Sequence, residues 1–191
     1  LGSVAALNRG KWIDNVIIVI ATCGIAVPSF VVCTILLYIF SLKLGWLPSY
    51  GLTGWKNYIM PVIALGFYPT AYICRLMRSS MLDVLGQDYM RTARAKGLTL
   101  NAAIRRHALR TSLIPTAVDV AFSIAGVFTG AVITENVFAI NGLGMYFTQT
   151  IANNDINGAV AVAAFGGVCT LTGALLADIF SAWLDPRIRL S

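Results

Sequence analysis

Residues 158–177 read GAVAVAAFGGVCTLTGALLA, and these twenty positions contain no charged side chain. A helix needs about 20 consecutive apolar residues to cross the hydrocarbon core of a bilayer. The apolar run extends to Ile179, with Asp178 close to its end. It therefore predicts a membrane-spanning helix over residues 158–179 and points to a helical membrane protein.

Three further apolar runs lie upstream of this one, over residues 16–40, 58–74 and 113–133. Hydrophobic residues make up 58% of the chain and charged residues only 12%, whereas soluble domains carry about 25% charged residues. Pro28 and Pro69 lie inside two of the runs, where packed membrane helices tolerate proline, and we expect kinks there. The chain is predicted to be a single all-α membrane domain over residues 1–191, a helical bundle with four spans.

The basic residues indicate the orientation of these spans. With four spans, three segments face one side of the membrane, and they contain 12 of the 14 lysines and arginines. Only Lys43 and Lys56 face the other side. Because cytoplasmic segments are enriched in basic residues, both ends and the loop 75–112 are predicted to be cytoplasmic. The twelve residues are Arg9, Lys11, Arg75, Arg78, Arg91, Arg94, Lys96, Arg105, Arg106, Arg110, Arg187 and Arg189.

The basic loop 75–112 contains signals for two short helices. Asp88 is placed to cap a helix over Tyr89 to Lys96, and Gly97 to end it. Thr99 is placed to cap a second helix over residues 100–111. Since a short polar helix is marginal alone, the first helix is expected to pack against another surface. The residues leave two interpretations open, namely contact with anionic lipid headgroups and docking of a cytoplasmic partner, with a slight preference for docking.

The segment GQDYMRTARAKGL, residues 86–98, resembles the cytoplasmic EAA loop of ABC importer permeases. Within these it is most similar to the dipeptide/oligopeptide/nickel permease family (MetI-like, permease B type), whose C-terminal portion the whole chain resembles. One departure is that Arg91-Thr92-Ala93 stands where the general motif has Glu-Ala-Ala, so no role of the glutamate is carried over. The other matching segments, in order, are Val27-Pro28-Ser29-Phe30, Leu44-Gly45-Trp46-Leu47-Pro48, Met60-Pro61, His107-Ala108-Leu109-Arg110 with Pro115, Glu135-Asn136-Val137-Phe138, Gly142-Leu143-Gly144 and Leu184-Asp185-Pro186-Arg187-Ile188-Arg189.

The resemblance implies a coupling helix that sits in a groove of a cytoplasmic ATPase. The ATPase-coupling residues that it implies are Tyr89, Arg91, Thr92, Ala93, Lys96 and Gly97. It also implies a second permease subunit, two ATPase subunits and an extracytoplasmic solute-binding protein as partners, in the inner or plasma membrane of a bacterium or archaeon. Two more spans and an outer domain are expected on the N-terminal side, and import is expected to follow alternating access.

The chain lacks a sequence for binding ATP. The only Gly-Lys pair, Gly10-Lys11, is followed by Trp12, and Ala5 occupies the position of the first glycine of a phosphate-binding loop. We therefore expect a non-catalytic subunit, with ATP and Mg bound by the partner ATPase and no cofactor or metal bound here. The four cysteines are widely spaced and form no Cys-x-x-Cys motif. No nucleic-acid partner is expected.

Two acidic residues are candidates for the solute pathway or its gate. Asp119 lies within the third predicted span and Glu135 at its outer end, and acids inside a membrane are functional candidates. A secondary transporter driven by ions or protons through Asp119 is the alternative function, and a membrane scaffold is a second rival. The segment 134–157 is apolar enough to fold back as a short helix. The solute stays open among dipeptides, oligopeptides, nickel chelates and glutathione-like molecules.

Overall fold

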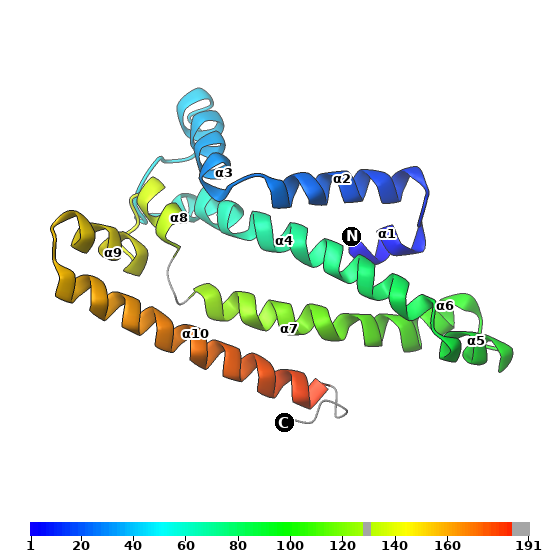
Figure 1. Cartoon of the computed structure of the whole chain (residues 1–191). Helices are drawn as coiled ribbons and strands as arrows, with labels where there is room; N and C mark the ends of the chain where they lie inside the picture. The colour runs from blue at the N-terminus through cyan, green and yellow to red at the C-terminus, as the bar shows by residue number, and fades with distance from the viewer. Residues whose placement is uncertain (128–130, 185–191) are drawn as a thin grey trace. The chain divides into compact units, whose positions relative to one another are not determined.

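The computed structural model describes residues 1–127 and 131–184, and this described part is helical and contains no strand (Figure 1). The all-α fold class is thereby confirmed. Arg187 and Arg189, with most of the matched segment at the C-terminus, lie outside the described residues, as do residues 128–130 of the third predicted span. The helices are α1 (Gly2–Leu7), α2 (Trp12–Ala26), α3 (Ser29–Leu36), the π-helical η1 (Leu37–Lys43), α4 (Lys56–Leu85), α5 (Asp88–Ala95), α6 (Leu100–Ala103), the π-helical η2 (Ile104–Ala108), α7 (Leu109–Val127), α8 (Val132–Val137), α9 (Leu143–Ala152) and α10 (Ile156–Leu184).

Two helices in the described part are long and apolar enough to cross a membrane. They are α4 and the portion Ile156–Phe180 of α10, and the bent pair formed by α2 and α3 with η1 counts as a third if it is one span. The second and fourth predicted spans lie inside α4 and α10, and α7 covers the third through Val127. The count of four spans stays a prediction.

The first predicted span is not a continuous helix. The chain leaves α2 after Ala26 and enters α3 at Ser29, and Pro28 between them is extended, with φ −60° and ψ 144°. Proline lacks the N–H that a helix interior requires, and its ring disfavours helical backbone in the residue before it. The expected kink at Pro28 is therefore a full break, whereas α4 continues as a helix through Pro69.

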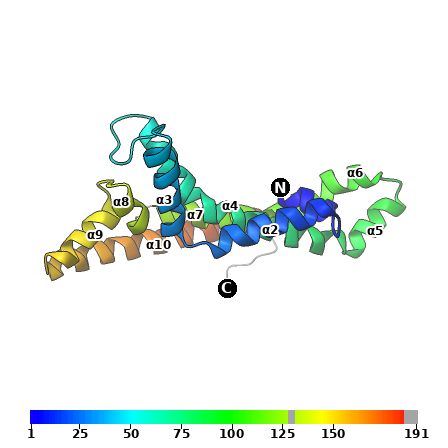
Figure 2. The same ribbon diagram turned by 90° about the horizontal axis from the view of Figure 1, so that it is seen from above.

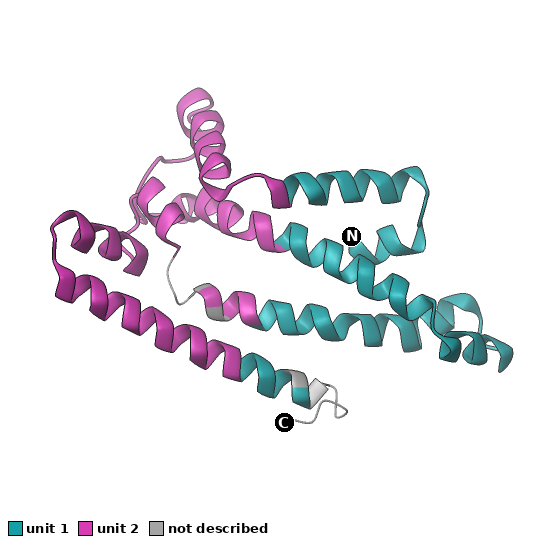
Figure 3. Ribbon diagram, in the orientation of Figure 1, with its two compact units in different colours: residues 1–24, 70–121, 176–191 teal, residues 25–69, 122–175 magenta. Residues whose placement is uncertain are grey.

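The chain forms two compact units, shown in different colours in Figure 3. Unit 1 comprises Leu1–Gly24, Thr70–Ala121 and Leu176–Ser191, and unit 2 comprises Ile25–Pro69 and Phe122–Leu175. Each unit has a hydrophobic cluster of its own, and the residues of interest divide between them. The predicted coupling residues lie in unit 1, and Glu135 lies in unit 2.

The core of unit 1 fixes the two short helices of the basic loop. Both α5 and α6 lie beyond the C-terminal end of α4 in Figures 1 and 2. Met side chains suit such a junction because they fill irregular gaps between helices. The buried cluster joins α1, α4, α5, α6 and η2 through Ala6, Met81, Val84, Met90, Ala103, Ile104 and Ala108.

A buried ion pair also ties the N-terminal helices to α4 within unit 1. Arg78 donates from Nε to Oδ1 of Asp14 at 2.7 Å and from Nη2 to Oδ2 at 2.8 Å. The Gly10 N–H donates to Oδ2 at 3.0 Å, and the Asp14 side chain is only 2% exposed. Arg78, counted above as a cytoplasmic positive charge, is therefore neutralised by a carboxylate 64 positions earlier in the chain.

The core of unit 2 forms around Phe138, which is 2% exposed and packs with Val32 and Cys33 of α3 and with Met60 and Ala64 of α4. Phe138 directly follows α8, so its burial holds α8 against α3 and α4. The expectation of a folded-back helix in residues 134–157 is met by two short helices, α8 and α9, in place of one.

Candidate functional site

The first helix of the basic loop begins one residue before its predicted start. Gln87 is the N-cap residue, with extended backbone and no side-chain cap hydrogen bond, so the prediction that Asp88 caps the helix is wrong. Asp88 is the first helical residue, where its negative charge complements the helix dipole, and it pairs with exposed Arg91 at 3.9 Å. Gly97 follows the helix with φ +89°. The predicted end of the helix at a glycine is therefore confirmed, because this backbone conformation favours glycine.

The helix α5 has one buried face and one exposed face. Met90 and Ala93, three positions apart, are 3% and 8% exposed, and Met90 belongs to the buried cluster of unit 1. The other predicted coupling residues, Tyr89, Arg91, Thr92, Lys96 and Gly97, are exposed. We expected the small Ala93 to let a partner approach closely. In the structure Ala93 is buried with Met90 on one face of α5, and its part in coupling stays a prediction.

The second helix of the loop begins as predicted. Thr99 is its N-cap residue, and its hydroxyl accepts a hydrogen bond from the Ala102 N–H at 3.4 Å. The helix then continues through η2 into α7 without an interruption. Because Ala103, Ile104 and Ala108 are buried on the inner side, the cations of this stretch lie outside. The exposed cations of the basic loop 75–112 from α5 onward, a segment called the α5–α6 hairpin below, are Arg91, Arg94, Lys96, Arg105, Arg106 and Arg110.

The two candidate pathway acids lie in different environments. Asp119 is half-buried on α7 in unit 1. Among the described residues the ion pairs join Asp14 to Arg78 and Asp88 to Arg91, and Asp119 belongs to neither. In the same described part, no group of three or more His, Cys, Asp or Glu residues could hold a metal ion.

Glu135 is engaged by the backbone of its own unit. Its Oε1 accepts from the Ala131 N–H at 3.0 Å, at the start of α8, and its Oε2 accepts from the Met145 N–H at 3.0 Å, in the first turn of α9. One carboxylate thus caps two helices, and charge-assisted bonds of this kind are strong. Glu135 therefore joins α8 to α9, and its place in the solute pathway or its gate stays a prediction.

Close packing of α9 against α8 requires Gly144. A Cβ atom there would lie 2.6 Å from Cα and 2.7 Å from N of Val132, and backbone atoms cannot shift cheaply. We expect Gly144→Ala to destabilise unit 2 by about 1–3 kcal/mol, as overpacking does, and to lower the melting temperature of the purified protein in detergent. Gly167→Ala is the matched control, since nothing lies within 4 Å of a Cβ there. An equal melting temperature for both variants would contradict the close packing.

Sequence reasoning missed the ion pair between Asp14 and Arg78, because no local sequence pattern predicts it. It listed Glu135 as a candidate for the solute pathway or its gate and did not predict the helix capping that the structure adds. The structure shows that a Cβ atom at Gly142 would collide with the Glu135 carboxylate. A carboxylate followed at a short distance by two glycines is compatible with a tight backbone-held turn.

The amino-acid sequence is similar to a known protein family and to several characterised permeases. Residues 1–190 match the family described as binding-protein-dependent transport system inner membrane component. The dipeptide transport system permease protein DppB of Bacillus subtilis is 38% identical over 190 residues, which is 100% of this chain and 62% of DppB. The oligopeptide transport system permease protein OppB of Haemophilus influenzae is 36% identical, over 98% of this chain and 62% of OppB. The glutathione transport system permease protein GsiC of Escherichia coli K12 is 34% identical, over 98% of this chain and 61% of GsiC. The chain therefore spans about three fifths of the length of these relatives.

Proposed function

The chain belongs to the family of binding-protein-dependent transport system inner membrane components, and on that premise we propose that it forms the membrane permease of an ATP-driven importer. The observation that carries this proposal is the match over residues 1–190, which includes both units. The resemblance seen in the sequence is confirmed at the level of the family, and the chain is a multi-pass membrane protein.

We propose that the exposed face of α5, with Lys96 and Gly97, docks on a cytoplasmic ATPase that binds ATP and Mg. Two features support this role. The face is cationic, which suits an acidic groove. It is also held by a buried cluster that includes Met90 and residues of α4, so a displacement of α5 would reach α4. In this proposal two ATPases, a second permease and a solute-binding protein complete the importer, and the ends and the α5–α6 hairpin lie in the cytoplasm.

The solute that we propose is a peptide. The similar permeases are named for dipeptide, oligopeptide and glutathione transport, and all three solutes carry amide bonds between amino acids. Di- or oligopeptides are therefore the first class to test, with glutathione as the next.

The test is uptake by the full-length protein reconstituted into proteoliposomes with its partner permease, ATPases and binding protein. Labelled trialanine is expected to enter only when ATP and the binding protein are both present. ATP-independent uptake would overturn the proposal.

Asp119→Asn separates this function from the ion-coupled alternative. An importer driven by ATP needs no titrating carboxylate in the membrane, so we expect the initial uptake rate to stay unchanged and to resist a protonophore. Loss of uptake in this variant together with protonophore sensitivity of the parent would favour proton coupling. Ser123→Ala on the same helix is the control for unspecific disturbance of α7.

A further inference from the structure

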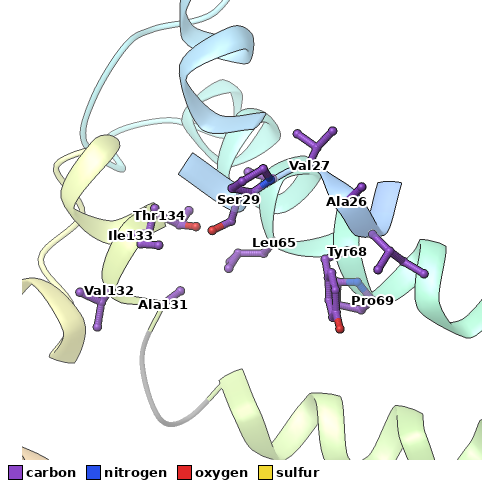
Figure 4. Close-up of a pocket in the computed structure, with 13 residues that line it drawn as sticks. Ala26, Val27, Ser29, Leu65, Tyr68, Pro69, Ala131, Val132, Ile133 and Thr134 are labelled. Carbon is purple, nitrogen blue, oxygen red and sulfur yellow. The ribbon is translucent and has the colours of Figure 1, made fainter. Parts of the chain in front are cut away.

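An open cavity of about 750 Å³ is formed by residues of unit 2. Its walls come from the end of α2, the start of α3, the middle of α4 and the start of α8, and Figure 4 shows the lining side chains. This volume is typical of sites for small molecules. Among the 13 lining residues none is charged, and most are apolar.

The cavity is lined by two prolines from the apolar runs, and one of them lies at a helix break. Its lining includes Pro28, at the break between α2 and α3, and Pro69, inside α4. Pro69 has no N–H to give to the carbonyl of Leu65, which also lines the cavity. In a membrane, a carbonyl that loses its helical donor needs another partner, which protein or a water-filled cavity can supply. The break between α2 and α3 adjoins this cavity, and discontinuous helices mark solute sites in membrane transporters.

Hydroxyl groups add a few polar positions to these apolar walls. Ser29 of α3 and Thr134 of α8 both line the cavity and are labelled in Figure 4. The Thr134 hydroxyl is 3.9 Å from the Cys33 thiol. Hydroxyls and carbonyls can accept hydrogen bonds from amide N–H groups, while apolar walls favour apolar side chains. A charged group would find no counter-ion among the lining residues.

We infer that this cavity contacts the transported solute and accepts an uncharged part of it, namely an apolar side chain with its flanking peptide amide. The inference rests on the proposed import of peptides and adds where, and by which chemistry, the solute is held. It predicts that the permease itself selects peptides by the size and charge of their side chains.

Filling the cavity tests the size preference. Leu65 is 42% exposed, so Leu65→Trp can place its ring in the cavity without entering the core. In the reconstituted full complex we expect this variant to lower uptake of Ala-Phe-Ala about tenfold more than uptake of Ala-Ala-Ala, as a pocket that loses room discriminates. Ile63→Trp is the matched control, because Ile63 is 46% exposed and does not line the cavity. Two positions along a helix turn it to another face by about 200°, so the control should keep the parent ratio.

Adding a charge tests the chemistry of the walls independently. Ser29→Asp is expected to raise uptake of Ala-Lys-Ala relative to Ala-Glu-Ala, measured with ATP hydrolysis and recovery of the complex as checks of assembly. If Leu65→Trp does not assemble, this ratio decides alone. Unchanged uptake ratios in assembled variants would overturn the inference that this cavity contacts the solute. They would indicate that another part of the permease occupies the cavity. Absence of ATP-dependent uptake by the unmodified complex would instead overturn the proposed function.

Discussion

Reversing two charges on α5, with Arg91→Glu and Lys96→Glu together, is expected to abolish recovery of ATPase subunits with the full-length permease. Both side chains are exposed, so the reversal leaves the core of unit 1 intact. An acidic groove that accepts the cationic face would then meet two negative charges, and like charges at an interface cost several kcal/mol. ATP-dependent uptake should be lost with the association.

The measurement is a detergent pull-down of the permease from its native membrane, with the bound ATPase quantified. Arg105→Glu with Arg106→Glu is the matched control, because it makes the same change of charge at exposed positions of η2, outside the proposed docking residues. Equal loss in both variants would show that the overall positive charge matters, as binding to anionic lipid requires. Full recovery with the α5 variant would contradict docking through this face.

Ala93→Asp is expected to give the same loss of ATPase by a different route. Ala93 is 8% exposed and is buried on the same face of α5 as Met90, so a carboxylate there must displace α5 or remain poorly hydrated. The helix α5 should detach, and limited proteolysis should then cut the chain near residues 86–98. The charge reversal at Arg91 and Lys96 should leave this segment protected. The comparison separates residues that contact the partner from the residue that positions them.

The features that the sequence predicts well are those with local causes. An uncharged run such as residues 158–177 indicates a span without reference to any other segment. Thr99 begins a helix by accepting a hydrogen bond from a backbone N–H three residues later, and Gly97 follows the end of a helix because its backbone adopts a positive φ. The buried face of α5 also has a local signal, since Met90 and Ala93 stand one helical turn apart. Reading that spacing would have separated Ala93 from the exposed coupling residues.

The features that the sequence does not predict depend on distant contacts. Pro28 breaks a helix and Pro69 does not, although both are prolines in apolar runs, because neighbouring segments decide whether the freed backbone groups are accommodated. Glu135 binds backbone N–H groups, and since nearly every residue has one, no residue type identifies its partners. Asp14 is the extreme case, with its partner Arg78 lying 64 positions away.

Arg78→Met is expected to reduce the yield of folded protein and to lower its melting temperature in detergent strongly. The substitution leaves the Asp14 carboxylate, which is 2% exposed, with one backbone donor from Gly10 and without its paired guanidinium. Removing one member of a buried pair is far more damaging than removing both, because the remaining charge lacks compensation. Arg75→Met is the matched control, since Arg75 is exposed on the same helix and belongs to neither of the ion pairs in the described part.

The double variant Asp14→Asn with Arg78→Met distinguishes the ion pair from simple packing. Asparagine keeps the shape of the carboxylate and an acceptor for the Gly10 N–H but removes the charge, so we expect it to recover much of the stability that Arg78→Met loses. A positive coupling between the two substitutions measures the pair. Additive losses would show that the Arg78 side chain acts through its own packing. Stability equal to the parent in Arg78→Met would show that α1 and α2 are held by apolar contacts alone, such as that of Ala6 in the core of unit 1. In that case the hydrophobic cluster, and not the ion pair, would connect α1 and α2 to the α5–α6 hairpin.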